Sequence, residues 1–310
     1  MLIATLPAVH EEILMEKIIS HPFVGGVRYN TGAKSPFSPK ETLERVLALT
    51  TEYGKKLWVD LKGRQLRITH WAVPRSGEIR LNHKVEFEPP ARVYFRGDEY
   101  SELKFVRDNV IYVDPQPRHA VGEGQAINII GDNVSVVGYS TEQDLEYIAA
   151  ACELGIFNFM LSFVESVDDA VEVWEAIKKS EGDCEDCELV LKIESQKGLE
   201  LIRKTELIPL RTCRLMAARD DLLINLDDDW NLLDDAQRLL ISRDPNAILA
   251  SRIFSGLEKN GMATLEDAVD LWRAQEMGYR HFMLSDGISC YHFDEAIRAW
   301  QDFLEICSGQ

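Results

Sequence analysis

The chain has 310 residues, of which 45% are hydrophobic and 28% are charged, and its formal net charge is −18. This is a globular composition and excludes a wholly disordered or collagen-like chain. Acidic residues outnumber basic ones by 52 to 34, which argues against a nucleic-acid-binding protein and against adhesion to anionic membranes. No apolar run reaches the ~18 residues of a membrane span, and no basic segment precedes the apolar start, so we expect a cytoplasmic protein.

Short apolar, β-branched runs alternate along the chain with stretches of helical periodicity. The strand-like runs are 2–5, 24–29, 56–61, 157–162, 188–193, 213–218, 247–251 and 281–285. The helical stretches are 10–20, 38–54 (opened by a Ser38 cap and a proline), 141–155, 167–179, 196–204, 229–242, 264–278 and 292–306. This alternation predicts parallel βα units, and eight of them predict an α/β fold, the closed (β/α)8 TIM barrel.

Residues 68–137 interrupt the alternation, because they show no helical period. They contain short alternating runs such as GEIRLNHKVEFE and ARVYFRG, separated by Gly, Pro and Asp. We therefore expect a small β-rich domain inserted after the third strand, with the barrel formed by 1–67 and 138–310. An insertion at the mouth of a barrel is placed to act as a lid.

Cysteines are sparse and irregularly spaced, which argues against a disulfide framework. Cys184 and Cys187 form a lone CxxC in an acidic stretch, and no second pair stands at zinc-binding distance in the sequence. A solvated loop with two incidental thiols is the main interpretation, and redox or metal chemistry is the alternative.

Charged residues concentrate at the carboxyl ends of the predicted strands, where barrels of this type carry their active sites. The cations are Arg28, Lys62, Arg67, Lys192 and Arg219, and the carboxylates are Asp60, Glu194 and Asp221. Carboxylates with waters and substrate oxygens suit Mg²⁺ or Mn²⁺, and several cations suit a phosphate or carboxylate substrate. Any single one of these residues could instead form a structural ion pair. Lys192 and Glu194 lie on one side of a strand end, where burial is costly unless the charges are used or paired.

Nine segments together resemble the pyruvate kinase family. They are ATLPA (4–8), VRYNTG (27–32), VDLKGRQLR (59–67), STEQDLEYI (140–148), LSFVES (161–166), LKIESQKGL (191–199), AARDDL (217–222), AILASRIFSGL (247–257) and MLSDG (283–287). The last is similar to the family's Met-Leu-Ser-Gly-Glu, and AARDDL to its Ala-Arg-Gly-Asp-Leu. The resemblance covers the catalytic barrel and a shortened lid, and stops before the family's C-terminal regulatory domain.

The resemblance implies phosphoryl transfer between phosphoenolpyruvate and a nucleoside diphosphate, with Mg²⁺ or Mn²⁺ as cofactor. Glu194 and Asp221 match the metal ligands, and Lys192 matches the group that stabilises the transferred phosphoryl group. The other matched residues are Arg28 and Ser251 (catalytic), Arg67, Lys62, Asp220 and Ser162 (substrate-binding), and Asn30 and Asp60 (monovalent cation). Because the family's barrels associate, a homodimer is expected.

Several substitutions depart from the family's pattern. Gly32, Leu61 and Gln65 replace a Ser, a Thr and a Glu near the monovalent-cation site, which argues against a K⁺ requirement. Asp220 replaces a Gly beside the substrate carboxylate, and Glu165 replaces an Arg. Two alternatives therefore stay open: a metal-dependent lyase, aldolase or decarboxylase that forms the enolate of pyruvate, and a non-catalytic sensor.

Overall fold

The computed structural model describes residues 1–70, 78–95, 100–118, 121–181, 187–204 and 213–308. The chain divides into two compact units, which are described separately. The first unit comprises Met1–Leu61 and Glu146–Gln310, and the second comprises Lys62–Leu145. The second unit extends beyond both ends of the insertion expected from the sequence, 68–137.

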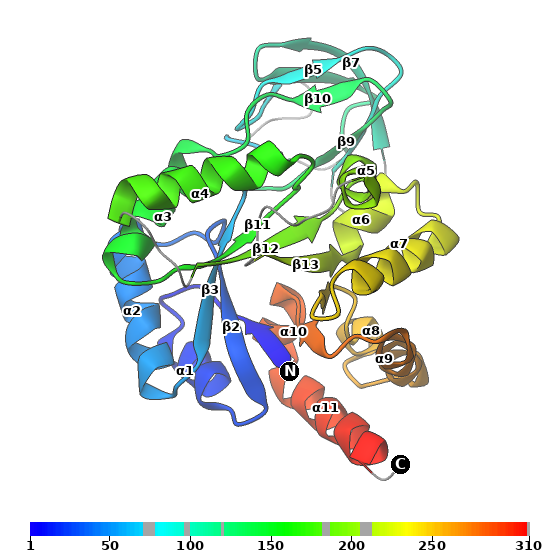
Figure 1. The fold of residues 1–310 in the computed structure, drawn as a ribbon. Helices are drawn as coiled ribbons and strands as arrows, with labels where there is room; N and C mark the ends of the chain where they lie inside the picture. The colour runs from blue at the N-terminus through cyan, green and yellow to red at the C-terminus, as the bar shows by residue number, and fades with distance from the viewer. Residues whose placement is uncertain (71–77, 96–99, 119–120, 182–186, 205–212, 309–310) are drawn as a thin grey trace. The chain divides into compact units, whose positions relative to one another are not determined.

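A closed barrel of parallel strands forms the centre of the first unit, in the order β1-β15-β14-β13-β12-β11-β3-β2 (Figure 1). The strands are β1 (Leu2–Thr5), β2 (Val24–Asn30), β3 (Lys56–Leu61), β11 (Asn158–Leu161), β12 (Glu188–Ile193), β13 (Cys213–Ala218), β14 (Ile248–Ala250) and β15 (His281–Met283). They lie where the sequence places them, and the predicted (β/α)8 fold is confirmed.

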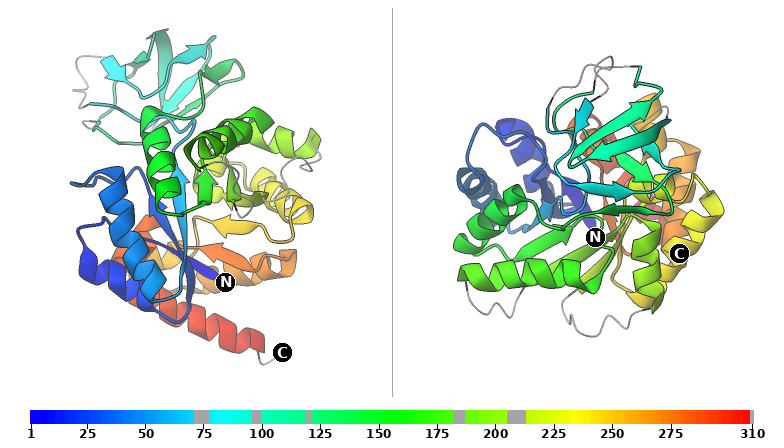
Figure 2. Two further views of the ribbon diagram at one scale, coloured as in Figure 1. Left: turned by 60° about the vertical axis from the view of Figure 1, so that its left-hand side comes forward. Right: turned by 90° about the horizontal axis from the view of Figure 1, so that it is seen from above.

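Helices surround this barrel on its outside, as the two views of Figure 2 show. The longer ones are α1 (Glu12–Ser20), α2 (Pro39–Glu52), α3 (Glu142–Glu153), α4 (Val167–Glu181), α5 (Gln196–Lys204), α7 (Trp230–Arg243), α9 (Leu265–Met277) and α11 (Phe293–Ser308). Helix α2 begins with a capping box, in which Ser38 accepts from the backbone N–H of Glu41 and the Glu41 carboxylate accepts from that of Ser38. The Ser38 cap predicted from the sequence is therefore present.

Three short helices that the sequence analysis did not predict follow the last barrel strands. They are α6 (Arg219–Asn225), α8 (Ser255–Asn260) and α10 (Asp286–Tyr291). Each is too short to show a helical period in the sequence. Helices α6 and α10 place acidic residues at the carboxyl ends of β13 and β15.

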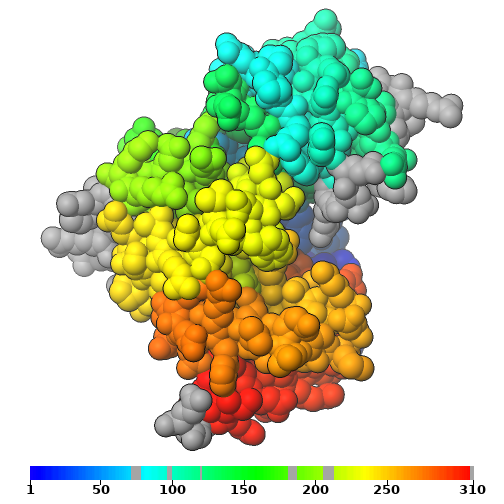
Figure 3. Space-filling model, turned by 90° about the vertical axis from the view of Figure 1, so that its right-hand side faces the viewer, coloured from blue at the N-terminus to red at the C-terminus, as the bar shows by residue number. Residues whose placement is uncertain are grey.

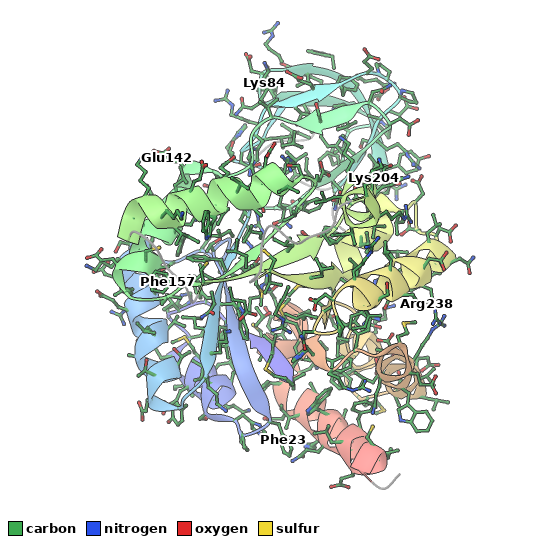
Figure 4. The ribbon with its side chains drawn as sticks, viewed as in Figure 1. Phe23, Lys84, Glu142, Phe157, Lys204 and Arg238 are labelled. Carbon is green, nitrogen blue, oxygen red and sulfur yellow. The ribbon has the colours of Figure 1, made fainter. Side chains whose placement is uncertain are left out.

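The barrel interior is filled by apolar side chains that the strands direct inward. One buried cluster takes residues from seven of the strands: Ile3, Trp58, Met160, Val190, Met216, Ala218, Ile248, Ala250 and Met283. Charged residues lie on the outer faces of the helices (Figure 4): Lys204 and Arg238 each pair with a carboxylate one turn earlier, Glu200 and Asp234. Such exposed pairs contribute little to stability, so the interior cluster dominates.

Figure 3 shows the face that carries α7 and α9, drawn yellow to orange. Several apolar side chains of these two helices are exposed. Trp230 of α7 and Leu265, Val269 and Trp272 of α9 are 45–77% exposed. The expected homodimer stays a prediction. Within the described residues, no helix is both long enough and apolar enough to cross a membrane.

Antiparallel strands build the second unit. They are β4 (Glu78–Arg80), β5 (Val85–Phe87), β6 (Arg92–Tyr94), β7 (Tyr100–Arg107), β8 (Val110–Asp114), β9 (Asn128–Ile130) and β10 (Val134–Val136). They form one sheet in the order β4-β8-β7-β6-β9 and a β10-β5 pair. This unit has an apolar core of its own, which includes Leu81, Val93 and Ile111.

Candidate active site

Arg28 and Asp60 form a buried ion pair at the carboxyl ends of β2 and β3. The Nε atom of Arg28 donates to Oδ2 of Asp60 at 2.8 Å, and Nη2 donates to the same oxygen. Nη1 donates to Oγ1 of Thr5 at 3.1 Å. Burial opposes the charged guanidinium, but the Asp60 and Asp286 carboxylates outweigh it and raise the pKa of Arg28. Arg28 is therefore a fixed cation in the mouth of the barrel.

Lys192 lies on the other side of Asp60. Its Nζ atom is 3.4 Å from Oδ1 of Asp60, 3.2 Å from Oε1 of Glu194 and 2.8 Å from Oγ of Ser162. Burial favours the neutral amine, but these carboxylates raise the pKa of Lys192, so it stays an ammonium group. The structure thus brings together four residues predicted from the sequence: Asp60, Ser162, Lys192 and Glu194.

The Glu194 carboxylate is held on two sides. Oε1 contacts Lys192, and Oε2 accepts from the backbone N–H of Phe163 at 2.7 Å. Phe163 has a φ of 51°, a conformation that non-glycine residues adopt at a cost of ~1 kcal/mol or more. Burial, together with the charge of Asp221 in the first turn of α6, raises the pKa of Glu194. Asp221 and Glu194 are therefore electrostatic neighbours.

Two cations and four carboxylates interact in this part of the site. Arg28 and Lys192 are the cations, and Asp60, Glu194, Asp221 and Asp286 are the carboxylates, which together give a formal charge of −2. The formal charge of these six side chains is that which a divalent cation would offset.

The carboxylate oxygens of Glu194 and Asp221 are of the ligand type that a magnesium or manganese ion prefers. Within the described residues, no group of three or more His, Cys, Asp or Glu side chains is arranged to hold a metal by itself. Two carboxylates nevertheless fit Mg²⁺, because this ion keeps several waters and is commonly bound by one or two carboxylates plus substrate oxygens. The residues therefore fit a metal that the substrate helps to bind.

The oxygens expected to bind a monovalent cation interact with donors of the protein itself. Oδ1 of Asn30 accepts from the backbone N–H of Gly32 at 3.0 Å, and the backbone carbonyl of Leu61 accepts from Oγ of Ser162 at 2.8 Å. The Asp60 carboxylate lies between Arg28 and Lys192. K⁺ would have to compete with these internal donors or share the oxygens with them. That K⁺ is not required stays a prediction.

Asp220, at the start of α6, pairs with Arg252, which follows β14. Oδ1 of Asp220 lies 2.9 Å from Nε of Arg252, and the guanidinium carbon lies 5.1 Å from the Trp230 ring centroid. Ser251 and Arg252 both have positive φ, 62° and 57°. The extra carboxylate at the predicted substrate-binding position is thus partly neutralised by a neighbouring cation.

Arg219 does not belong to the site, contrary to the expectation for a strand-end cation. Nη1 and Nη2 donate to the two carboxylate oxygens of Asp270 on α9 at 2.6 and 2.8 Å, and Nε donates to the Ser251 carbonyl at 3.0 Å. A bidentate, nearly buried pair of this kind is structural. It fixes the loop that carries Ser251.

Lys62 and Arg67 belong to the second unit. The backbone N–H groups of Lys62 and Gly63 donate to the buried Asp144 carboxylate at 2.7 and 3.1 Å. The Arg67 guanidinium donates to Oε1 of Gln65 at 2.7 and 3.0 Å and to the Gly124 carbonyl at 2.7 Å. The neutral Gln65 amide thus orients Arg67 without cancelling its charge.

Two residues of this region were missed by the sequence analysis, Thr5 and Asp286. Asp286 contacts both Arg28 and Asn30. The signal in the sequence is MLSDG itself, in which the acidic residue stands one position earlier than in the family's Met-Leu-Ser-Gly-Glu. Of the CxxC pair, Cys184 lies outside the described residues, and Cys187 is buried.

A family model described as the barrel domain of pyruvate kinase matches residues 99–291. The chain belongs to the pyruvate kinase family. It is 25% identical over 282 residues to a pyruvate kinase of Methanocaldococcus jannaschii, covering 85% of this chain and 60% of that protein. It is 24% identical over 308 residues to a pyruvate kinase of Clostridium perfringens, covering 89% of this chain and 62% of that protein. The chain therefore spans about three fifths of the length of these relatives.

Proposed function

We propose that this chain catalyses a pyruvate kinase-like reaction, metal-dependent phosphoryl transfer between phosphoenolpyruvate and a nucleoside diphosphate. The observation that carries the proposal is the buried cluster in which Lys192 contacts both Glu194 and Asp60, with Arg28 beside it. A catalyst of phosphoryl transfer chiefly needs fixed cations and a metal at the transferred group. Family membership supports the same reaction class.

In the proposed reaction, the bond between phosphorus and the enol oxygen breaks, and a bond forms to the terminal phosphate oxygen of the diphosphate. Lys192 and Arg28 would bind the phosphoryl oxygens in transit, since both are held as buried cations. The enolate that remains would take a proton at its methylene carbon to give pyruvate. Ser251, which stands at the family's Thr position, is our candidate for relaying that proton.

Glu194 and Asp221 would hold the divalent metal, Mg²⁺ or Mn²⁺. When bound, the ion would supply Lewis-acid stabilisation of charge on the enolate and phosphoryl oxygens. Asp220, Ser162, Lys62 and Arg67 are proposed substrate contacts. The expected partners are thus small anionic substrates and ADP or ATP, and the expected compartment is the cytoplasm.

A coupled assay with lactate dehydrogenase tests the proposal by measuring pyruvate formed from phosphoenolpyruvate and ADP, with and without Mg²⁺ or Mn²⁺. Lys192→Met should lower kcat by about 100-fold or more, because it removes a cation that faces the transition state. Lys204→Met is the matched control, since Lys204 is 74% exposed and pairs with Glu200 on its own helix. No metal-dependent turnover by folded wild-type protein would contradict the proposal.

The contact between Asp286 and Arg28 favours a second candidate, enolate chemistry on pyruvate without a nucleotide. A carboxylate already lies at the cation proposed to bind phosphate. This candidate predicts metal-dependent exchange of the pyruvate methyl protons in deuterated water without ADP or phosphate. Absence of exchange would exclude it.

A further inference from the structure

Asp286 presents its carboxylate to the candidate site from the first residue of α10. Oδ2 accepts from Nη1 of Arg28 at 3.3 Å, and Oδ1 accepts from Nδ2 of Asn30 at 3.3 Å. Its side chain is 56% exposed, whereas those of Arg28 and Asp60 are 9% and 0% exposed. Asp286 is therefore the partner of Arg28 that solvent and solutes reach.

The N–H donors of the Arg28 guanidinium differ in how accessible they are to a ligand. Nε and Nη2 donate to buried Asp60, and Nη1 donates to buried Thr5 as well as to Asp286. A phosphate group that approaches Arg28 from solvent would find Nη1 shared with a carboxylate. It would have to displace Asp286 or bind beside its negative charge.

The position of Asp286 is fixed by the helix that it begins. Ser285 caps α10, and its Oγ accepts from the backbone N–H of Ile288 at 3.3 Å. A carboxylate in the first turn is favoured by the helix dipole. The family's motif has glycine at this position and a glutamate at the next, where this chain has Gly287, so the carboxylate of this chain lies one residue earlier.

We propose that Asp286 is a specificity-determining residue, which weakens binding of a phosphate-bearing substrate relative to the unphosphorylated 2-oxo acid. The inference rests on the proposed function, which places the phosphoryl group at Arg28. Repulsion between Asp286 and a phosphate dianion opposes phosphoenolpyruvate. Pyruvate carries no group at that position and escapes the penalty.

The test is equilibrium binding by calorimetry, with Mn²⁺ present and without a nucleotide, for phosphoenolpyruvate and pyruvate separately. Asp286→Asn keeps the shape and one acceptor oxygen, which can serve Arg28 or Asn30, but removes the charge. We expect it to tighten phosphoenolpyruvate binding about five-fold and to change pyruvate binding less than about two-fold, with the difference shrinking at high salt. Asp286→Glu keeps the charge and should retain the wild-type preference.

Asp294→Asn is the matched control, because Asp294 forms a half-exposed ion pair with Lys17 and should leave both affinities unchanged. An unchanged or weakened affinity of Asp286→Asn for phosphoenolpyruvate would overturn the inference. So would the absence of detectable phosphoenolpyruvate binding to both the wild-type protein and Asp286→Asn. Equal changes for both ligands would also overturn it, since they would indicate a purely structural role through Asn30. Because no turnover is measured, these outcomes are independent of those of the coupled assay.

Discussion

The Oδ1 atom of Asp60 lies 3.4 Å from the Nζ atom of Lys192, and both groups are buried near the ends of β3 and β12, the two strands that flank β11 in the barrel. The other oxygen of Asp60 contacts Arg28. One carboxylate thus holds both cations that we propose to act on the phosphoryl group. Its removal would leave two buried positive charges short of a partner.

Asp60→Asn should therefore lower the free energy of unfolding by about 3 kcal/mol, because breaking a buried ion pair leaves uncompensated charge. Urea unfolding followed by circular dichroism measures this change. Asp294→Asn, at an exposed ion pair, should cost less than about 1 kcal/mol. Equal losses for the two variants would contradict a central role for Asp60.

Potassium should not be required for turnover. Asn30, Asp60 and Leu61 would have to offer oxygens to the ion, yet each already accepts a hydrogen bond or contacts an internal cation. We expect the rate in tetramethylammonium chloride to be within about two-fold of the rate in KCl at equal ionic strength, which keeps screening constant. Activation by K⁺ of ten-fold or more would show that these internal bonds open.

Asp220 and Arg252 should act as a coupled pair. Arg252→Gln leaves the Asp220 carboxylate without its cation, so KM for phosphoenolpyruvate should rise by about five-fold. In an Asp220→Asn background the same change should alter KM by less than about two-fold, because the pair is already broken. Steady-state kinetics of the four proteins measure the coupling, and additive effects would show that the 2.9 Å contact does not influence the substrate.

His281, at the start of β15, should make stability depend on pH. Burial and the nearby Arg214 lower the pKa of His281 from 6.5 to about 4, although the carboxylates of Asp244 and Glu188 oppose the shift. The unfolded chain therefore binds the proton more readily, so this contribution to stability is complete above pH 6.5 and is lost as the pH falls towards 4. Between pH 7 and pH 5, the free energy of unfolding measured in urea should fall less for His281→Asn than for wild type. Identical losses would contradict the lowered pKa of His281.

Much of the fold follows from local sequence patterns. The barrel strands are short buried runs, and the capping box at Ser38 is visible in the sequence. The strand-end position of Lys192 and Glu194 also predicts their contact, because alternate residues share one side of a strand.

The missed features depend on contacts between distant segments. Asp286 reaches Arg28 across 258 positions only because β15 and β2 both flank β1 in the closed barrel. Arg219 turns to Asp270 because α9 supplies a bidentate partner, which no pattern around Arg219 reveals. Sequence periodicity predicts the helices and strands. Which charged side chains pair at the mouth of the barrel can be read only from the closed structure.

Phosphorus NMR of the chain with phosphoenolpyruvate, ADP and Mg²⁺ tests the central proposal most directly, because it follows the transferred group itself. The proposal predicts that the phosphoenolpyruvate signal falls while the signals of ATP grow in equal amount, and that Lys192→Met abolishes this change. A constant phosphoenolpyruvate signal, or its replacement by inorganic phosphate alone, would contradict phosphoryl transfer to the nucleotide.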